Sequence, residues 1–86
     1  MSELKFRGTI EIAVFVKNQI DKYHGRFTTR TELVKIISEL LAIPENRYMI
    51  FKEADLKASF KKKLGKARLK TLKSILQELN LEKEEE

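Results

Sequence analysis

Apolar residues recur three or four positions apart through most of this 86-residue sequence, a spacing that lines one side of an α-helix. Four such stretches run over residues 9–24, 29–41, 52–64 and 66–81. A chain of this length can build one hydrophobic core only, because an independent core needs about 50 residues. The pattern therefore predicts an all-α fold, a small single domain of three to four helices over residues 1–81.

The first stretch is compatible with two kinds of structure. Its apolar residues at spacings of four, four and three are Ile12, Val16, Ile20 and Tyr23. This spacing favours a helix from Thr9 to His24. Every second residue from position 10 to position 16 is also apolar and β-branched, which is the pattern of a half-buried strand. We favour the helix and keep a short N-terminal strand as the alternative.

The second stretch has the clearest local signal, a capping box at its start. Thr29 stands three residues before Glu32. The Thr29 hydroxyl can accept from the Glu32 amide while the Glu32 carboxylate accepts from the Thr29 amide, so a helix is expected to begin here. Pro44 marks its end, because the residue before a proline avoids the helical conformation. Residues 43–48 are predicted to be a loop.

Two further amphipathic stretches follow, one on each side of Gly65. Leu56, Phe60 and Leu64 stand four apart, which predicts a helix over residues 52–64. A break or kink is expected at Gly65, because glycine is a poor residue inside a helix. The last stretch has the three-four-three spacing of a helix-packing seam at Leu69, Leu72, Leu76 and Leu79. We assign these leucines to the domain's own core and keep a homodimer seam as the alternative.

The predicted core gathers periodic apolar residues from all four stretches. They are Ile12, Val16, Ile20, Leu33, Ile37, Leu40, Leu56, Phe60, Leu64, Leu69, Leu72, Leu76 and Leu79. Residues 48–51 are expected to form a lid over this core.

The net charge of +5 is unevenly distributed along the chain. Residues 51–73 hold nine basic and two acidic residues, giving +7, whereas residues 74–86 hold one lysine and five glutamates, giving −4. The basic residues expected to contact a phosphate backbone are Lys57, Lys61, Lys62, Lys63, Lys66, Arg68, Lys70 and Lys73. The alternative is a solvated helix surface without a ligand. Residues 82–86 are predicted to be an acidic, disordered tail.

The composition argues against most sites that carry chemistry. With no cysteine and one histidine, neither a disulfide nor a structural zinc site is expected. The three glycines stand in no phosphate-binding motif, and His24 is assigned to a helix end, where an imidazolium is favourable. No catalytic residue, metal or cofactor is predicted, and the protein is expected not to be an enzyme. Weak binding of a divalent cation by the acidic tail is left open.

Residues 27–37, Phe-Thr-Thr-Arg-Thr-Glu-Leu-Val-Lys-Ile-Ile, resemble the turn and second helix of ribbon-helix-helix DNA-binding proteins. The resemblance extends over residues 4–41. It implies a strand over residues 4–10 that pairs with a second copy and directs Lys5, Arg7 and Thr9 toward the major groove. It also implies that backbone amides at the start of the second helix hold a phosphate.

Two functions are compatible with these patterns. The first is a small non-enzymatic DNA-associated binding protein whose basic helical block contacts the phosphates of duplex DNA, with residues 53–64 and 66–79 as a helix-turn-helix-like pair. The alternative is a protein–protein interaction subunit or adaptor of a larger complex, using the leucine-rich last helix and the basic face.

The cellular setting can be predicted in outline. No apolar run approaches the roughly 18 residues of a membrane span and no secretory signal is visible, so no membrane contact and a cytoplasmic location are expected. Charged residues at 36% with neither Cys nor Trp are typical of thermophilic, archaeal-like proteins.

Overall fold

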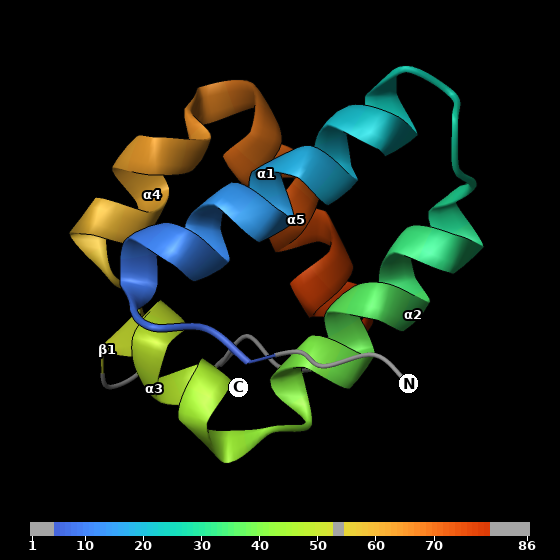
Figure 1. Ribbon diagram of the computed structural model, residues 1–86. Helices are drawn as coiled ribbons and strands as arrows, with labels where there is room; N and C mark the ends of the chain where they lie inside the picture. Colours follow the sequence, from blue (N-terminus) through green and yellow to red (C-terminus); the bar gives the residue numbers. More distant parts are fainter. Residues whose placement is uncertain (1–4, 53–54, 80–86) are drawn as a thin grey trace.

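The computed structural model describes residues 5–52 and 55–79. These residues form five α-helices and one two-stranded sheet (Figure 1). In chain order the elements are α1 Thr9–His24, α2 Arg30–Leu41, α3 Pro44–Ile50, β1 Phe51–Lys52, β2 Asp55–Leu56, α4 Ala58–Leu64 and α5 Lys66–Glu78. The mostly helical small domain is confirmed, whereas the predicted number of three to four helices is wrong.

The N-terminal half follows the predicted pattern from Thr9 onward. Helix α1 has the bounds that the apolar spacing predicts. Residues 5–8 have no regular structure and residues 9 and 10 already belong to α1, so the alternative of a short strand is wrong for these positions. The capping box is confirmed, because Thr29 N donates to Glu32 Oε1 at 2.9 Å and Glu32 N donates to Thr29 Oγ1 at 3.2 Å.

Helix α3 forms where a loop was predicted over residues 43–48. Pro44 ends one helix and also occupies the first turn of the next, where its fixed φ and missing N–H are favourable. Asn46 is 1% exposed, and its Nδ2 donates to the Leu40 carbonyl at 3.0 Å, which ties α3 to the end of α2. The residues of the predicted lid, 48–51, differ in burial. Ile50 is buried in the core, whereas Tyr48 is 76% exposed.

A short hairpin replaces the start of the predicted third helix. Strands β1 and β2 are antiparallel, with Phe51 opposite Leu56 and Lys52 opposite Asp55. Lys57 N continues the pairing by donating to the Ile50 carbonyl at 2.8 Å. The helix expected over residues 52–64 therefore begins only at Ala58, and its first part is extended.

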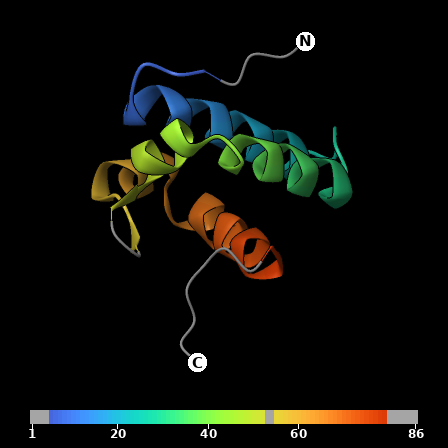
Figure 2. The ribbon, with the colours of Figure 1, turned by 90° about the horizontal axis from the view of Figure 1, so that it is seen from below.

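The helices enclose one core. Figure 2 shows α1, α2 and α3 in one layer with α5 crossing beneath them, and α4 packs against α1 at the side. The predicted core is largely confirmed, except that Leu69 and Leu79 are only partly buried. Residues that the prediction left out of this core are Ala13, Leu41, Ile50 and Ile75. The leucine stripe of α5 thus packs inside its own domain.

Within the part of the chain that the structure describes, none of the helices is both long enough and apolar enough to pass through a bilayer.

Candidate nucleic-acid interface

Seven of the predicted basic residues are lysines, six on the two helices that meet at Gly65 and Lys57 at the N-cap of α4. We call this set the basic corner; its members are Lys57, Lys61, Lys62, Lys63, Lys66, Lys70 and Lys73. Helix α4 buries Phe60 and Leu64, which leaves the three lysines between them at the surface or half-buried. On α5 the lysines stand three or four residues apart, so they form one stripe, and the buried residues Leu72, Ile75 and Leu76 occupy the opposite side.

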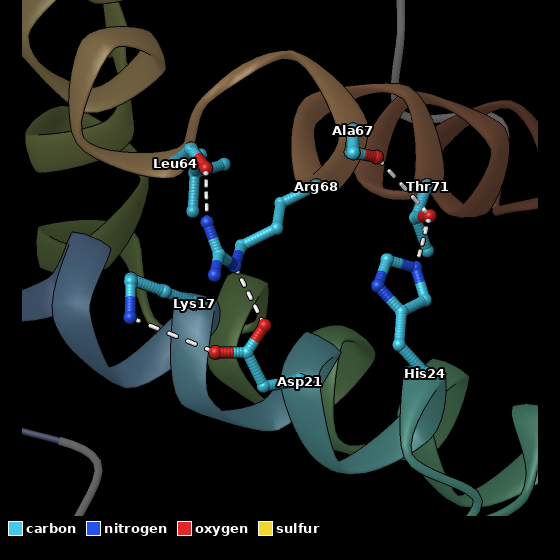
Figure 3. Close-up of polar contacts among 7 residues, drawn as sticks. All are labelled: Lys17, Asp21, His24, Leu64, Ala67, Arg68 and Thr71. Atoms are coloured by element: carbon cyan, nitrogen blue, oxygen red, sulfur yellow. Dashed lines mark hydrogen bonds and ion pairs between the residues drawn. The ribbon is translucent and has the colours of Figure 1, made fainter.

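Arg68 is placed differently from the seven lysines. Its Nε donates to Asp21 Oδ1 at 2.6 Å and its Nη1 donates to the Leu64 carbonyl at 3.0 Å, as Figure 3 shows. The guanidinium therefore joins α1 to the end of α4 from its position on α5. Arg68 lies outside the basic corner because its donors are directed into the protein.

Asp21 is the acidic partner in this contact. Its other oxygen lies 3.6 Å from Lys17 Nζ, one helical turn earlier on α1. The hydrogen bond from Arg68 is the main cause that lowers the pKa of Asp21, and the charges of Arg68 and Lys17 act in the same direction. The carboxylate is thus held in its charged form against two cations.

Among the described residues, Asp55 is an acidic group within reach of the basic corner. Its Oδ2 lies 3.6 Å from Lys61 Nζ, and its Oδ1 accepts from its neighbour's amide, Leu56 N, at 2.8 Å. The Leu56 amide is the main cause that lowers the pKa of Asp55, followed by the charge of Lys61 and, more weakly, that of Lys73. Lysines from both α4 and α5 therefore act on one carboxylate.

A second set of polar contacts fixes α5 against the turn between α1 and α2. His24, the last residue of α1, lies 2.8 Å from Thr71 Oγ1 through its Nε2, consistent with its predicted position at a helix end (Figure 3). Arg30 Nη2 donates to Ser74 Oγ at 3.0 Å and to Glu78 Oε1 at 2.9 Å. These contacts hold the side of α5 that adjoins the lysine stripe.

Sequence reasoning missed these tertiary pairs. The partners Asp21 and Arg68 are 47 residues apart, and Arg30 and Glu78 are 48 apart. The available signal was a polar residue every third or fourth position on the last helix, beside the leucines, but that pattern does not say which element it faces.

Two features of residues 5–52 and 55–79 bear on ligand binding outside the basic corner. A groove of about 330 Å³ lies between the N-terminal segment and α3; its lining residues are Lys5, Phe6, Ile43, Glu45, Asn46 and Met49. Within the same residues no three His, Asp or Glu side chains gather as metal ligands would. The candidate site is therefore the basic corner.

Comparison with known proteins gives a family. A family described as conserved hypothetical protein matches residues 4–77. The chain belongs to this family. No curated protein and no solved structure matches the chain. The matched range contains the whole basic corner, Asp21 and Asp55. The resemblance of residues 4–41 to ribbon-helix-helix proteins stays a prediction.

Proposed function

We propose that the protein binds nucleic acid non-enzymatically, by contacts from the basic corner to the phosphates of duplex DNA. The supporting observation is that six of the seven lysines have no carboxylate within ion-pair distance in the described part of the chain, Lys61 with Asp55 being the exception. The basic residues of α1, α2 and α5 that do form ion pairs there are Lys17, Arg30 and Arg68.

Clustered unpaired lysines favour a polyanion for an electrostatic reason. Like charges held three or four residues apart on a helix repel one another, and a phosphate backbone relieves that repulsion. Each phosphate that a lysine neutralises releases condensed counterions, so binding depends steeply on salt. The structure offers no cluster of base-reading side chains among these lysines, so we expect contacts to the backbone with little sequence preference.

Helices α4 and α5 differ in two respects from the helix-turn-helix-like pair expected from the sequence. Helices α4 and α5 are joined by Gly65 alone, whereas that motif has a turn of three or four residues. Arg68, which was expected to face phosphate, is engaged with Asp21 and Leu64. The proposed contacts therefore come from the seven lysines and not from Arg68.

The test is fluorescence anisotropy of a labelled duplex with two triple variants of equal charge. One replaces Lys62, Lys66 and Lys70 by glutamine, and the other replaces Lys22, Lys35 and Arg47, which are exposed on α1, α2 and α3. Both change the net charge from +5 to +2 (5 − 3 = 2). We expect the first to weaken binding at least about tenfold near 50 mM salt and to reduce the salt slope by about three, because three phosphate contacts are lost.

The control triple distinguishes placement from total charge. It should bind within about threefold of the wild type, because its cations lie outside the basic corner. An equal loss of duplex affinity in the two triple variants would mean that binding depends only on the net charge of the protein. No wild-type binding near 50 mM salt would rule out the proposed function.

An interaction subunit is the second candidate function, and exposed aromatic residues favour it. Phe27 is 83% exposed and Tyr48 is 76% exposed. Leu72 and Leu76 are almost fully buried, so a protein partner would contact these aromatics or the basic corner and not the leucine stripe. Recovery of one stoichiometric protein after nuclease treatment, lost on Phe27→Ala, would favour this function over DNA binding.

A further inference from the structure

Asp55 has a fixed position beside the basic corner. It is the first residue of β2, opposite Lys52, and the Leu56 amide holds its Oδ1 at 2.8 Å. The carboxylate is 74% exposed, and its Oδ2 lies 3.6 Å from Lys61 Nζ. A negatively charged group of this kind presents oxygen acceptors to a lysine as a phosphate does.

The carboxylate acts on both helices of the corner. Lys61 of α4 is its ion-pair partner, and the charge of Lys73 on α5 also contributes to the low pKa of Asp55. No carboxylate lies within ion-pair distance of Lys62, Lys66 or Lys70 in the described residues. The corner is thus divided into lysines near an internal acid and lysines without one.

We propose that Asp55 competes with phosphate for Lys61, so that the other lysines of the basic corner make the first contacts and the affinity stays below what seven lysines could give. This inference rests on the proposed function. Binding a phosphate at Lys61 requires its ion pair with Asp55 to open.

A purely structural role for Asp55 would have a different consequence. An exposed pair of this length contributes little to folding, and the local contact of the Asp55 side chain with the hairpin backbone is the bond from Leu56 N to Oδ1. Asp55→Asn retains an oxygen at that position and removes only the charge. The variant therefore separates the competitor role from the shape of the hairpin.

The first experiment measures duplex binding by wild type, Asp55→Asn and Glu39→Gln. Glu39 is exposed on α2 and forms no ion pair with α4 or α5 in the described residues, and both variants change the net charge from +5 to +6 (5 + 1 = 6). We expect Asp55→Asn to bind about two- to fivefold more tightly, the range set by a surface ion pair, and to steepen the salt slope by about one. Glu39→Gln should stay within about 1.5-fold of wild type.

A double-mutant cycle with Lys61→Gln gives the second readout. In wild type, Lys61→Gln should cost less affinity than Lys62→Gln, because Asp55 already holds Lys61. In the Asp55→Asn background, Lys61→Gln should cost as much as Lys62→Gln. Thermal unfolding of each variant checks that the fold is kept.

The outcomes separate the two proposals. If wild type does not bind the duplex, the proposed function fails. If wild type binds but Asp55→Asn matches Glu39→Gln in affinity and salt slope, the function stands and the competitor role is overturned. A tighter Asp55→Asn with a non-additive cycle supports both.

Discussion

Arg68 contacts two other helices beside the basic corner, although it is not one of the lysines of that set. From α5 it donates to Asp21 on α1 and to the Leu64 carbonyl at the end of α4. The Leu64 carbonyl belongs to the last turn of its helix, where acceptors lack an intrahelical donor, so a guanidinium satisfies it well. Arg68 therefore links α4 and α5 to α1 beside the lysines of both helices.

The low pKa of Asp21 predicts a dependence of stability on pH. Because the folded protein lowers this pKa below its ordinary value of 3.8, the charged carboxylate stabilises the fold above that pH. Its contribution is lost as the pH falls through the lowered pKa of the folded state. Asp21→Asn should therefore destabilise the protein at pH 7, and the difference in unfolding free energy from wild type should shrink below about pH 4.

Urea unfolding of wild type and Asp21→Asn at a series of pH values from 7 to about 2.5 measures this difference. Glu39→Gln is the control, because Glu39 has no ion-pair partner in the described residues and its replacement should have a small effect throughout. A difference for Asp21→Asn that stays constant down to the lowest pH would mean that its charge does not contribute.

At the scale of elements, Gly65 is the residue that allows α4 and α5 to meet. It ends one helix and precedes the other with φ 86° and ψ 167°, a region that is essentially restricted to glycine. An added Cβ would meet Arg68 Nη1 at 3.8 Å, an ordinary contact distance without a clash. The requirement for glycine is thus a matter of backbone conformation and not of crowding.

Gly65→Ala should therefore destabilise the protein by about 1–3 kcal/mol through backbone strain alone. Gly8→Ala is a matched control, because Gly8 precedes α1 in an extended conformation with φ −179° and has no atom within 4 Å of an added Cβ. Its effect should be about 0.5 kcal/mol, the loss expected when alanine replaces glycine at a helix N-cap, and so smaller than that of Gly65→Ala. Chemical denaturation compares the two, and equal effects would contradict the argument from φ.

The elements differ in how far the sequence predicts them. Helices α1 and α2 are predicted well, because long apolar periodicity and a capping box are local signals. Helix α3 was missed since Pro44 gives the same local signal for the end of one helix and the start of another. The hairpin was missed because strands of two residues are too short to show alternation.

The candidate site was predicted in composition but not in detail. A run of lysines between Lys57 and Lys73 can be counted from the sequence, and amphipathic spacing places most of them outside the core. Which basic residues of this segment are paired depends on Asp21, which accepts from Arg68, and on Asp55, which lies beside Lys61. The pairing of Asp21 with Arg68 is set by packing between distant segments, and that of Asp55 with Lys61 by the hairpin that the sequence did not reveal.

In the whole molecule, the clustered positive charge that favours phosphate binding should also lower the stability of the free protein. The +7 of residues 51–73 lies on two short helices over a small core. Such clustering is unfavourable for the free protein, because like charges three or four residues apart on a helix repel. Folding alone does not favour such clustering of positive charge, whereas binding to a polyanion does.

Lys70→Gln tests this opposition in one substitution. Lys70 stands four residues after Lys66 and three before Lys73 on α5, so its neutralisation relieves two repulsive pairs and should stabilise the protein by about 0.4–1 kcal/mol at low salt. The gain should disappear in about 1 M salt, where screening is nearly complete at these distances. The same variant should bind duplex DNA more weakly, so that stability and affinity move in opposite directions.

Lys35→Gln is the control for that experiment, and it lowers the net charge by the same amount. Lys35 stands three residues after Glu32 and four before Glu39 on α2, so its neutralisation removes attraction and should not stabilise the fold. Its affinity for the duplex should stay close to that of wild type. If Lys70→Gln leaves both stability and affinity unchanged, the lysines of α5 are simply solvated and the basic corner has no electrostatic role.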